Sequence, residues 1–280
     1  MAVNTPNAQY QLMRERWETM NDVCDGAPAI KLHPYKYLPY TQCDDDGKRF
    51  IQYAKRAVFY ETTKDTLQSH VGLAFSEDPS FEPDGMDFLK SNADGAGKSI
   101  YQLNQLALVG LLKHGRGGYL VDNPSVESGI SKAQAETMGL RPVIVHYDAL
   151  SIINWRVKKV GGEYRLSLVV LHEIENVVDP QDEFQEKAVN VYRVLRLDEN
   201  NRYSVQVYSD NTGELIGSDL IYPTRQGGTW DIIPFIFLGS QVNDSNIHDI
   251  PLEPLANINL AHYRNSAEYE ESVFVCGEVQ

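Results

Sequence analysis

The sequence predicts an α+β protein with N-terminal helices, an antiparallel β meander and a C-terminal amphipathic helix. Up to about residue 113, apolar side chains recur at spacings of three and four, which is the period of a helix. From Ile152 onward, short apolar runs are separated by turn residues, which indicates consecutive strands. The helical spacing returns after Pro251. Helices followed by strands, without regular alternation of the two, favour α+β over α/β.

The first helix is expected to begin at Thr5, whose side chain can cap it, with Pro6 in the first turn, where a missing N–H is tolerated. Gly26 is a suitable C-terminal stop. The face that we expect to be buried carries Tyr10, Met13, Trp17, Met20 and Cys24. The next segment, LHPYKYLPY at 32–40, contains two prolines and three tyrosines and is expected to be an extended linker that packs on another part of the chain.

Two more helical regions are expected before the strands. Residues 45–75 carry two successive apolar stripes, formed by Phe50, Tyr53, Ala57 and Tyr60, and then by Leu67, His70, Val71 and Ala74. Pro79 and Pro83 end this pattern. A further helix is expected from about Lys98 to Lys113, with Ile100, Leu103, Ala107 and Leu111 on its apolar face, and HGRGG at 114–118 ends it.

Two short strands are expected next, GYLVD at 118–122 and PVIVHYD at 142–148, with a brief helix capped by Ser131 between them. The meander then follows as two hairpins, 152–160 with 163–176 across Gly161–Gly162, and 189–197 with 202–209 across Asn200–Asn201. A third turn at 211–213 leads to WDIIPFIFLG at 230–239, which is expected to close the meander. The alternation of apolar and polar residues is clean at 202–209 and poor in VVLHEIEN at 169–176.

The last helix is predicted from an apolar stripe that Glu270 interrupts, formed by Ala256, Leu260, Tyr263, Ala267 and Phe274. The final FVCGEVQ at 274–280 is expected to be a strand-like stub without a partner, so that more structure should follow. We divide the chain into a helical part at 1–117, a β-rich part at 118–240, and a loop and helix at 241–280.

Composition narrows the function classes. The net charge of −14, without a run rich in lysine and arginine, argues against tight binding of nucleic acid or anionic membranes. Cys24, Cys43 and Cys276 are far apart and include no CxxC pair, so neither a zinc site nor a disulfide framework is expected. No segment is apolar enough for a signal core or a membrane span, and a soluble, intracellular protein is expected. No cofactor is expected.

Two motifs suggest an enzyme only weakly. NADGAGKS at 92–99 resembles a phosphate-binding loop, but Asn92 replaces its first glycine and no strand precedes it, so Asp94 and Gly95 are better explained as cap and entry turn of the next helix. HEIEN at 172–176 lacks the second histidine of a zinc-binding helix and lies in an expected strand. A nucleotide- or metal-dependent enzyme that uses NADGAGKS or acidic clusters, such as Asp44–Asp46, stays an open alternative.

Trp155 in NWR has two interpretations. Ordinary sheet packing is favoured over a subunit contact, although tryptophan, tyrosine and arginine are enriched at interface hot spots. On that second ground Trp155, Arg156, Tyr263 and Arg264 are candidate subunit-interface residues.

Several segments occur together in an order that points to one family. They are WETMNDVCDG, YLPY, RAVFYETTKDTLQSHVGLAFSEDP, LLKHGRGGYLVDNP, RPVIVHYDALSIINWR, VYRVLRL, IPFIFLGSQVND and PLEPLANINLAHYRNSAEYEES. Together they span nearly the whole chain, which resembles the portal proteins of tailed bacteriophages, in particular a portal-like branch of phages and prophages catalogued as a domain of unknown function.

The resemblance implies a non-enzymatic subunit of a dodecameric ring at one capsid vertex, located in the virion and, during assembly, in the host cytoplasm. The present residues would form the portal wing, while stem, clip, channel loop and crown would lie beyond Gln280. Implied partners are other copies of the chain, the large terminase, a head–tail adaptor, the major capsid protein, and duplex DNA that passes through the channel without tight binding. No membrane is implied. A virion adaptor or other binding module with the same architecture is a further alternative.

Overall fold

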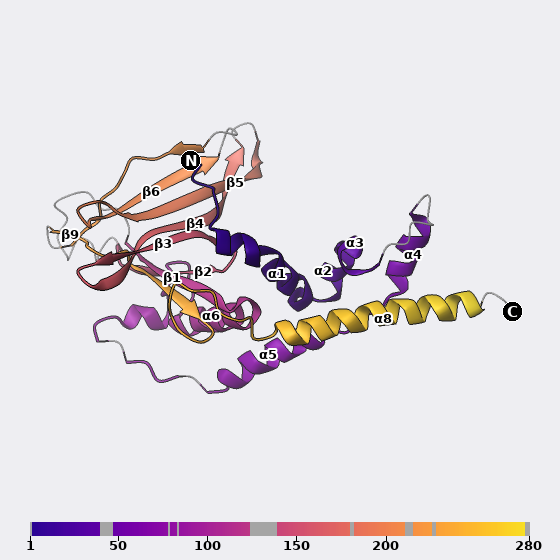
Figure 1. The fold of residues 1–280 in the computed structure, drawn as a ribbon. Coiled ribbons are helices and arrows are strands. Elements are labelled where there is room, and N and C mark those ends of the chain that lie inside the picture. Colours follow the sequence, from indigo (N-terminus) through magenta and orange to yellow (C-terminus); the bar gives the residue numbers. More distant parts are fainter. Residues whose placement is uncertain are drawn as a thin grey trace.

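The computed structural model describes residues 2–39, 47–77, 79–82, 84–123, 139–179, 182–210, 215–225 and 228–277 (Figure 1). Its helices are α1 (Ala8–Asp25), α2 (Ala27–Leu32), α3 (Pro34–Tyr37), α4 (Lys48–Arg56), α5 (Thr62–Ala74), the 3₁₀ helix η1 (Asp87–Lys90), α6 (Ile100–His114) and α8 (Glu253–Gly277). Its strands are β1 (Arg116–Asp122), β2 (Val143–Asp148), β3 (Ile152–Val160), β4 (Glu163–Asp179), β5 (Asp182–Leu197), β6 (Tyr203–Asp210), β7 (Leu215–Gly217), β8 (Thr224–Arg225), β9 (Gly228–Thr229) and β10 (Phe235–Gly239).

The predicted α+β fold is confirmed, with helices first, an antiparallel meander next and a long helix last. Strands β3 to β7 pair in chain order as a five-stranded half-barrel, and β10, β1 and β2 form a separate three-stranded sheet. Helix α6 packs on the three-stranded sheet, while α8 extends away from both sheets alongside α5 (Figure 1). Helix α1 connects the sheets to this helical region.

The prediction that residues 230–239 close the meander was wrong, because β10 pairs with β1 instead, from Phe235 opposite Leu120 to Gly239 opposite Arg116. A glycine in β1 explains this pairing. A Cβ atom on Gly118 would lie 2.2 Å from the Phe235 ring, so only glycine leaves room for that ring. The Phe235 and Phe237 rings then meet edge to face, with 5.0 Å between centroids, in the core.

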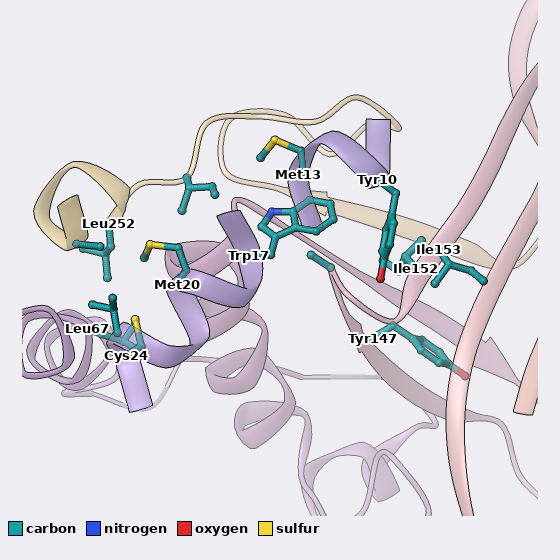
Figure 2. Close-up of a cluster of buried hydrophobic side chains, with 14 of the residues drawn as sticks. Tyr10, Met13, Trp17, Met20, Cys24, Leu67, Tyr147, Ile152, Ile153 and Leu252 are labelled. Atoms are coloured by element: carbon teal, nitrogen blue, oxygen red, sulfur yellow. The ribbon is translucent and has the colours of Figure 1, made fainter. Parts of the chain in front are cut away.

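The buried face of α1 is confirmed, since Tyr10, Met13, Trp17, Met20 and Cys24 are all buried (Figure 2). The fully buried Trp17 donates its indole N–H to the carbonyl of His114 at 2.9 Å, which joins α1 to the end of α6. The Tyr10 hydroxyl donates to the Leu150 carbonyl at 3.0 Å, which joins α1 to the turn before β3. One continuous core therefore extends from the helices into the sheets.

The helix starts differ from the predictions. Helix α1 is capped by Asn7, whose Oδ1 accepts from the Gln9 amide at 2.9 Å, whereas the Thr5 hydroxyl bonds back to Ala2. Asparagine is a stronger N-cap than threonine. The helix therefore begins after Asn7, and Pro6 precedes it instead of lying in its first turn. Gly26 ends α1 at a φ of 94°, as predicted.

The linker prediction for 32–40 was wrong at Leu32, which ends α2, and over 34–37, because Pro34 begins the short helix α3, where proline is tolerated in the first turn. The region 45–75 is two helices, α4 and α5, and not one. Residues 57–61 separate them, and the Val58 amide donates to the Ser266 hydroxyl of α8 at 3.1 Å. Tyr60, expected in the first apolar stripe, is exposed in that break.

Helix α6 is capped by Ser99 and not by Asp94. The Ser99 hydroxyl accepts from the Gln102 amide at 3.2 Å, and the Gln102 side chain accepts from the Ser99 amide at 2.9 Å. This reciprocal pair satisfies two amides at the start of the helix. Gly115, at a φ of 70°, ends the helix, and β1 begins directly after it.

Both predicted hairpins are confirmed. Gly161 and Gly162 have φ values of 61° and 114° and join β3 to β4, which suits a tight turn that needs left-handed residues. In the second hairpin Asn201 has a φ of 57°, and Asp198 Oδ1 accepts from the Asn200 and Arg202 amides, both at 2.8 Å. The predicted helix at Ser131, the turn at 211–213 and the acidic run at 44–46 lie outside the described residues.

In α8 the predicted stripe is buried from Ala256 to Ala267, while Phe274 is exposed and packs under the Arg56 guanidinium at 4.0 Å. The expectation of a strand-like stub from Phe274 was wrong, since α8 continues helically to Gly277. The contact between Phe274 and Arg56 joins this last part of α8 to α4.

Candidate functional site

The phosphate-loop-like segment is closed by its own side chains. Asn92 Oδ1 accepts from the Gly97 amide at 3.0 Å, and Asp94 Oδ1 accepts from the Ala96 and Lys98 amides at 2.8 and 2.9 Å. A phosphate would need free amides and a free lysine in such a loop. Here the Asn92 and Asp94 side chains already bond these amides, and Asp94 also pairs with the lysine.

Lys98 itself is paired, because its Nζ lies 3.1 Å from Asp94 Oδ2. Desolvation raises the pKa of Asp94, but the amide hydrogen bonds and the ammonium together outweigh it and hold the pKa below its ordinary value. The element before the loop is the 3₁₀ helix η1, not a buried strand. The arrangement is therefore an entry turn for α6, as the sequence indicated.

The HEIEN segment at 172–176 does not have the geometry of a zinc-binding helix either. His172 lies in strand β4, and its Nε2 is 2.9 Å from Asn190 Oδ1 on the neighbouring strand β5. Within the part of the chain that the structure describes, no three or more His, Cys, Asp or Glu side chains come together as a metal site would require. Asp244, an acidic residue in the loop before α8, is hydrogen-bonded to His248 Nε2 at 3.1 Å and to Asn246.

Trp155, the first candidate interface residue, is a core residue, as the favoured interpretation predicted. Its ring is buried and lies 4.1 Å from the Arg116 guanidinium and edge to face with Phe237 at 6.1 Å. Its neighbour Arg156 is exposed on β3. Alternation along a strand accounts for this difference, because successive side chains point to opposite faces.

Arg116, which no pattern in the sequence singled out, is the most deeply buried arginine or lysine among the described residues. Its guanidinium also lies 4.1 Å from the Phe237 ring, and its Nη1 donates to the carbonyls of Ser245 and Asn246 at 3.0 and 2.8 Å. Burial lowers its pKa to about 9. This side chain fastens the loop before α8 to the three-stranded sheet, and only the HGRGG run at the end of α6 marks its position in the sequence.

Tyr263 and Arg264, the other two candidate interface residues, differ in exposure as Trp155 and Arg156 do. Tyr263 is fully buried and meets Phe59 edge to face at 5.6 Å. Arg264 is exposed, and its Nε donates to the Tyr37 carbonyl at 3.0 Å. Of the four candidates, Arg156 and Arg264 thus lie on the surface of one copy, and their role in an interface stays a prediction.

A polar network that the sequence did not predict joins the two main sheets. The Tyr147 hydroxyl of β2 donates to Glu173 Oε1 of β4 at 2.5 Å. Arg193 of β5 donates from Nε to the same carboxylate at 2.8 Å and from Nη1 to Asp122 of β1 at 3.1 Å. Desolvation is the main reason that the pKa of Tyr147 is raised. Every charge in this network has a partner, so it serves as a clamp between sheets and presents no free acid or base.

A groove of about 240 Å³ runs between α8 and the segment before α5. It is lined by Tyr60, Thr62, Leu255, Ile258, Asn259 and His262. The polar group at its base is already satisfied, because Asn259 donates to the Tyr60 carbonyl at 2.8 Å and accepts from Thr63. The groove therefore suits an apolar side chain better than a polar ligand.

Exposed apolar side chains lie on the outer half of the β4–β5 hairpin, residues 174–179 and 182–188, which we call the ribbon. Phe184 is 89 % exposed and Ile174 is 65 % exposed, and Val178 is also exposed. The sequence reasoning did not identify them. The poor alternation at 169–176 was the available signal, since a strand with both faces in water does not need a strict apolar face.

The sequence matches no protein-family model, and none of the curated proteins is significantly similar to it. Among the described helices, none combines the length and the apolar character that crossing a membrane requires.

Proposed function

We propose that the protein is a structural, non-enzymatic subunit of a phage portal ring and forms the wing region of that ring. The observation that carries the proposal is the order of the elements. Packed helices, an antiparallel sheet and a long helix follow one another along the chain, which is the order that the resemblance to portal proteins implies for a wing.

The surface chemistry supports a self-assembling protein. Exposed apolar side chains gather on the ribbon and along α8, where Ile258, Tyr269 and Val273 face solvent in one copy. Apolar patches of this kind mark protein interaction sites more often than isolated exposed residues do. A ring needs two different complementary surfaces on every subunit, one for each neighbour.

The titratable groups favour a structural role over catalysis. The polar groups of the loop at 92–99 and of the Tyr147–Glu173–Arg193 network bind one another. A catalytic site would instead hold a nucleophile, acid or base with an unsatisfied position for substrate. The acidic composition suits passage of DNA without adhesion, because like charges repel.

Negative-stain electron microscopy tests the proposal. The protein expressed from its complete gene, with the neighbouring capsid genes, should yield ring-shaped particles with a central channel. A product that stays monomeric at high concentration, or particles whose rings lack this chain on antibody labelling, would contradict it. Gene order provides a second check, since a portal gene should lie beside terminase and capsid genes.

A further inference from the structure

We propose that the ribbon of one copy docks on a basic helical surface of a second copy, formed by α2, α3 and α4, which we call the basic arm. The inference deepens the proposed function and rests on it, since it names the two surfaces by which neighbouring subunits would meet. The contact is heterologous, because a different surface of each copy takes part.

Among the described strands, none pairs with the ribbon from outside it. β3 pairs with β4 only up to Leu171, and β6 pairs with β5 only from Val191. Between these points the backbones of the two strands pair only with each other among the described strands, and residues 182–188 are all exposed. A free two-stranded hairpin is only marginally stable in water, so a partner that covers it would stabilise it.

One face of the ribbon carries three exposed apolar side chains beside polar ones. Ile174 lies opposite Asn190 and Val178 opposite Glu186, and Phe184 is on the same face of β5 as Glu186. These three apolar side chains therefore form one exposed strip that ends at the tip. An aromatic side chain of this exposure at a tip is the kind of anchor that interface hot spots use.

The ribbon is also strongly acidic. It contains five acidic residues, Glu175, Asp179, Asp182, Glu183 and Glu186, against the single cation Lys187. An acidic rim around an apolar strip selects a partner whose apolar surface carries cations.

The basic arm has that character in a chain of net charge −14. Residues 27–60 contain six cations, Lys31, Lys36, Lys48, Arg49, Lys55 and Arg56, against three acidic residues, Asp44–Asp46, which lie outside the described residues. Among the described residues, Lys31 and Lys55 have no carboxylate partner. Lys36 pairs with Asp22 of α1, and Arg49 and Arg56 pair with Glu271 of α8, so Lys31 and Lys55 are the cations on which the contact depends.

Packing within the arm places its apolar side chains beside these lysines. The Lys31 ammonium donates to the Lys55 carbonyl at 3.3 Å, which brings α2 to the end of α4. The Tyr35 ring stacks on Phe50 at 4.5 Å, which brings α3 to the start of α4. Leu32 and Tyr35 are 76 % and 62 % exposed, and Ile51 is also exposed, so the arm presents apolar and cationic groups together.

Within one copy the two surfaces lie apart (Figure 1). The arm packs beside the C-terminal half of α8, whereas the ribbon belongs to the five-stranded sheet on the other side of α1 (Figure 1). A second copy supplies both the opposite charge and the apolar side chains that each surface needs. Complementary charge would orient the two copies, and burial of Phe184 with Leu32 and Tyr35 would supply affinity.

Charge exchange provides the test, measured by sedimentation velocity over a concentration series in 50 and 300 mM NaCl. The ribbon variant carries Glu183→Lys and Glu186→Lys, and the arm variant carries Lys31→Glu and Lys55→Glu. A control variant carries Glu15→Lys and Glu199→Lys, two exposed acids far from both surfaces. Circular dichroism and thermal unfolding should match the wild type for all three, because every replaced side chain is exposed.

The wild type should self-associate, and its dissociation constant should rise at least tenfold at the higher salt concentration. Each variant alone should associate at least tenfold more weakly, the control should behave as the wild type, and Phe184→Ser should weaken association by a similar factor. An equimolar mixture of the ribbon and arm variants should recover association, because the exchanged charges attract again.

Several results would overturn the inference. They are a wild type that stays monomeric, variants that associate as tightly as the wild type, a mixture that shows no recovery, and loss of duplex DNA binding as the only effect of the arm variant. Rings seen by microscopy with the ribbon variant would overturn this contact alone and leave the portal proposal standing. Absence of rings from the complete gene would instead overturn the portal proposal.

Discussion

Acid is expected to destabilise the protein through His114, the last residue of α6. Its ring is buried, its Nε2 lies 2.9 Å from Asn21 Oδ1, and its Nδ1 has no partner. Burial is the largest cause that lowers the pKa of His114 from 6.5 to about 4, although Asp148 acts in the opposite direction. The folded protein therefore holds a neutral imidazole at pH values where the unfolded chain binds a proton.

The direction in which the free energy of unfolding changes with pH follows from the number of protons that each state binds. Between pH 6.5 and pH 4 the unfolded state binds more protons at this site, so the free energy of unfolding rises with pH and falls on acidification. The contribution is fully present above pH 6.5 and is lost as the pH falls toward 4. The full difference between the two pKa values corresponds to about 3 kcal/mol, and about 2 kcal/mol of it should be lost by pH 5.

Urea unfolding between pH 7.5 and pH 4.5 measures this loss when the wild type is compared with His114→Gln. Carboxylates also titrate in this range, but the difference between the two proteins cancels their contribution. The wild type should be the more stable protein at pH 7.5, and that advantage should shrink by about 2 kcal/mol at pH 5. His70→Gln, at an exposed position of α5, is the matched control for replacing a histidine by glutamine. Parallel stability curves for wild type and His114→Gln would refute the burial argument.

Three further predictions use the same stability assay or a binding assay. Trp17→Ala should lower the free energy of unfolding by about 3–5 kcal/mol, since it removes a fully buried indole and its hydrogen bond to His114; a loss below 1 kcal/mol in urea unfolding would contradict the assigned core. Gly118→Ala should cost about 1–3 kcal/mol because its Cβ would overlap Phe235, whereas Gly72→Ala, with no atom within 4 Å, should be neutral or stabilising. Lys98→Ala should leave calorimetric titration with ATP and Mg²⁺ at the background of the wild type, because Asp94 occupies the loop; nucleotide binding that disappears in the variant would restore the enzyme hypothesis.

Local patterns predicted what local forces decide. The buried face of α1 follows from the spacing of its apolar residues, and the stop at Gly26 from a backbone conformation that glycine adopts readily. The β3–β4 and β5–β6 hairpins follow from turn residues that fix the pairing of neighbouring strands. The capping details were less predictable, because Thr5, Asn7, Asp94 and Ser99 are all good caps and tertiary packing selects among them.

Long-range pairing could not be predicted in the same way. β10 lies close in sequence to β7, yet it pairs with β1, because Gly118 leaves a space that the Phe235 ring fills. No spacing in the sequence indicates which strand will provide that space. The clamp of Tyr147, Glu173 and Arg193 joins residues from three strands, and Arg116 is buried by rings that lie 39 and 121 positions away.

The ribbon and the basic arm show how surface function separates from fold. Phe184 of the ribbon and Leu32 and Lys55 of the basic arm are exposed and lie outside the continuous core. Folding alone therefore does not require these side chains. Exposed apolar groups also increase the risk of aggregation, which acidic side chains along a free strand edge reduce. A purely protective role would need the acids but not Phe184 at the tip. The combination of an aromatic tip, an acidic rim and a cationic apolar surface elsewhere on the chain is what a specific partner contact requires. Substitution of Phe184 alone therefore distinguishes a docking ribbon from a protected edge.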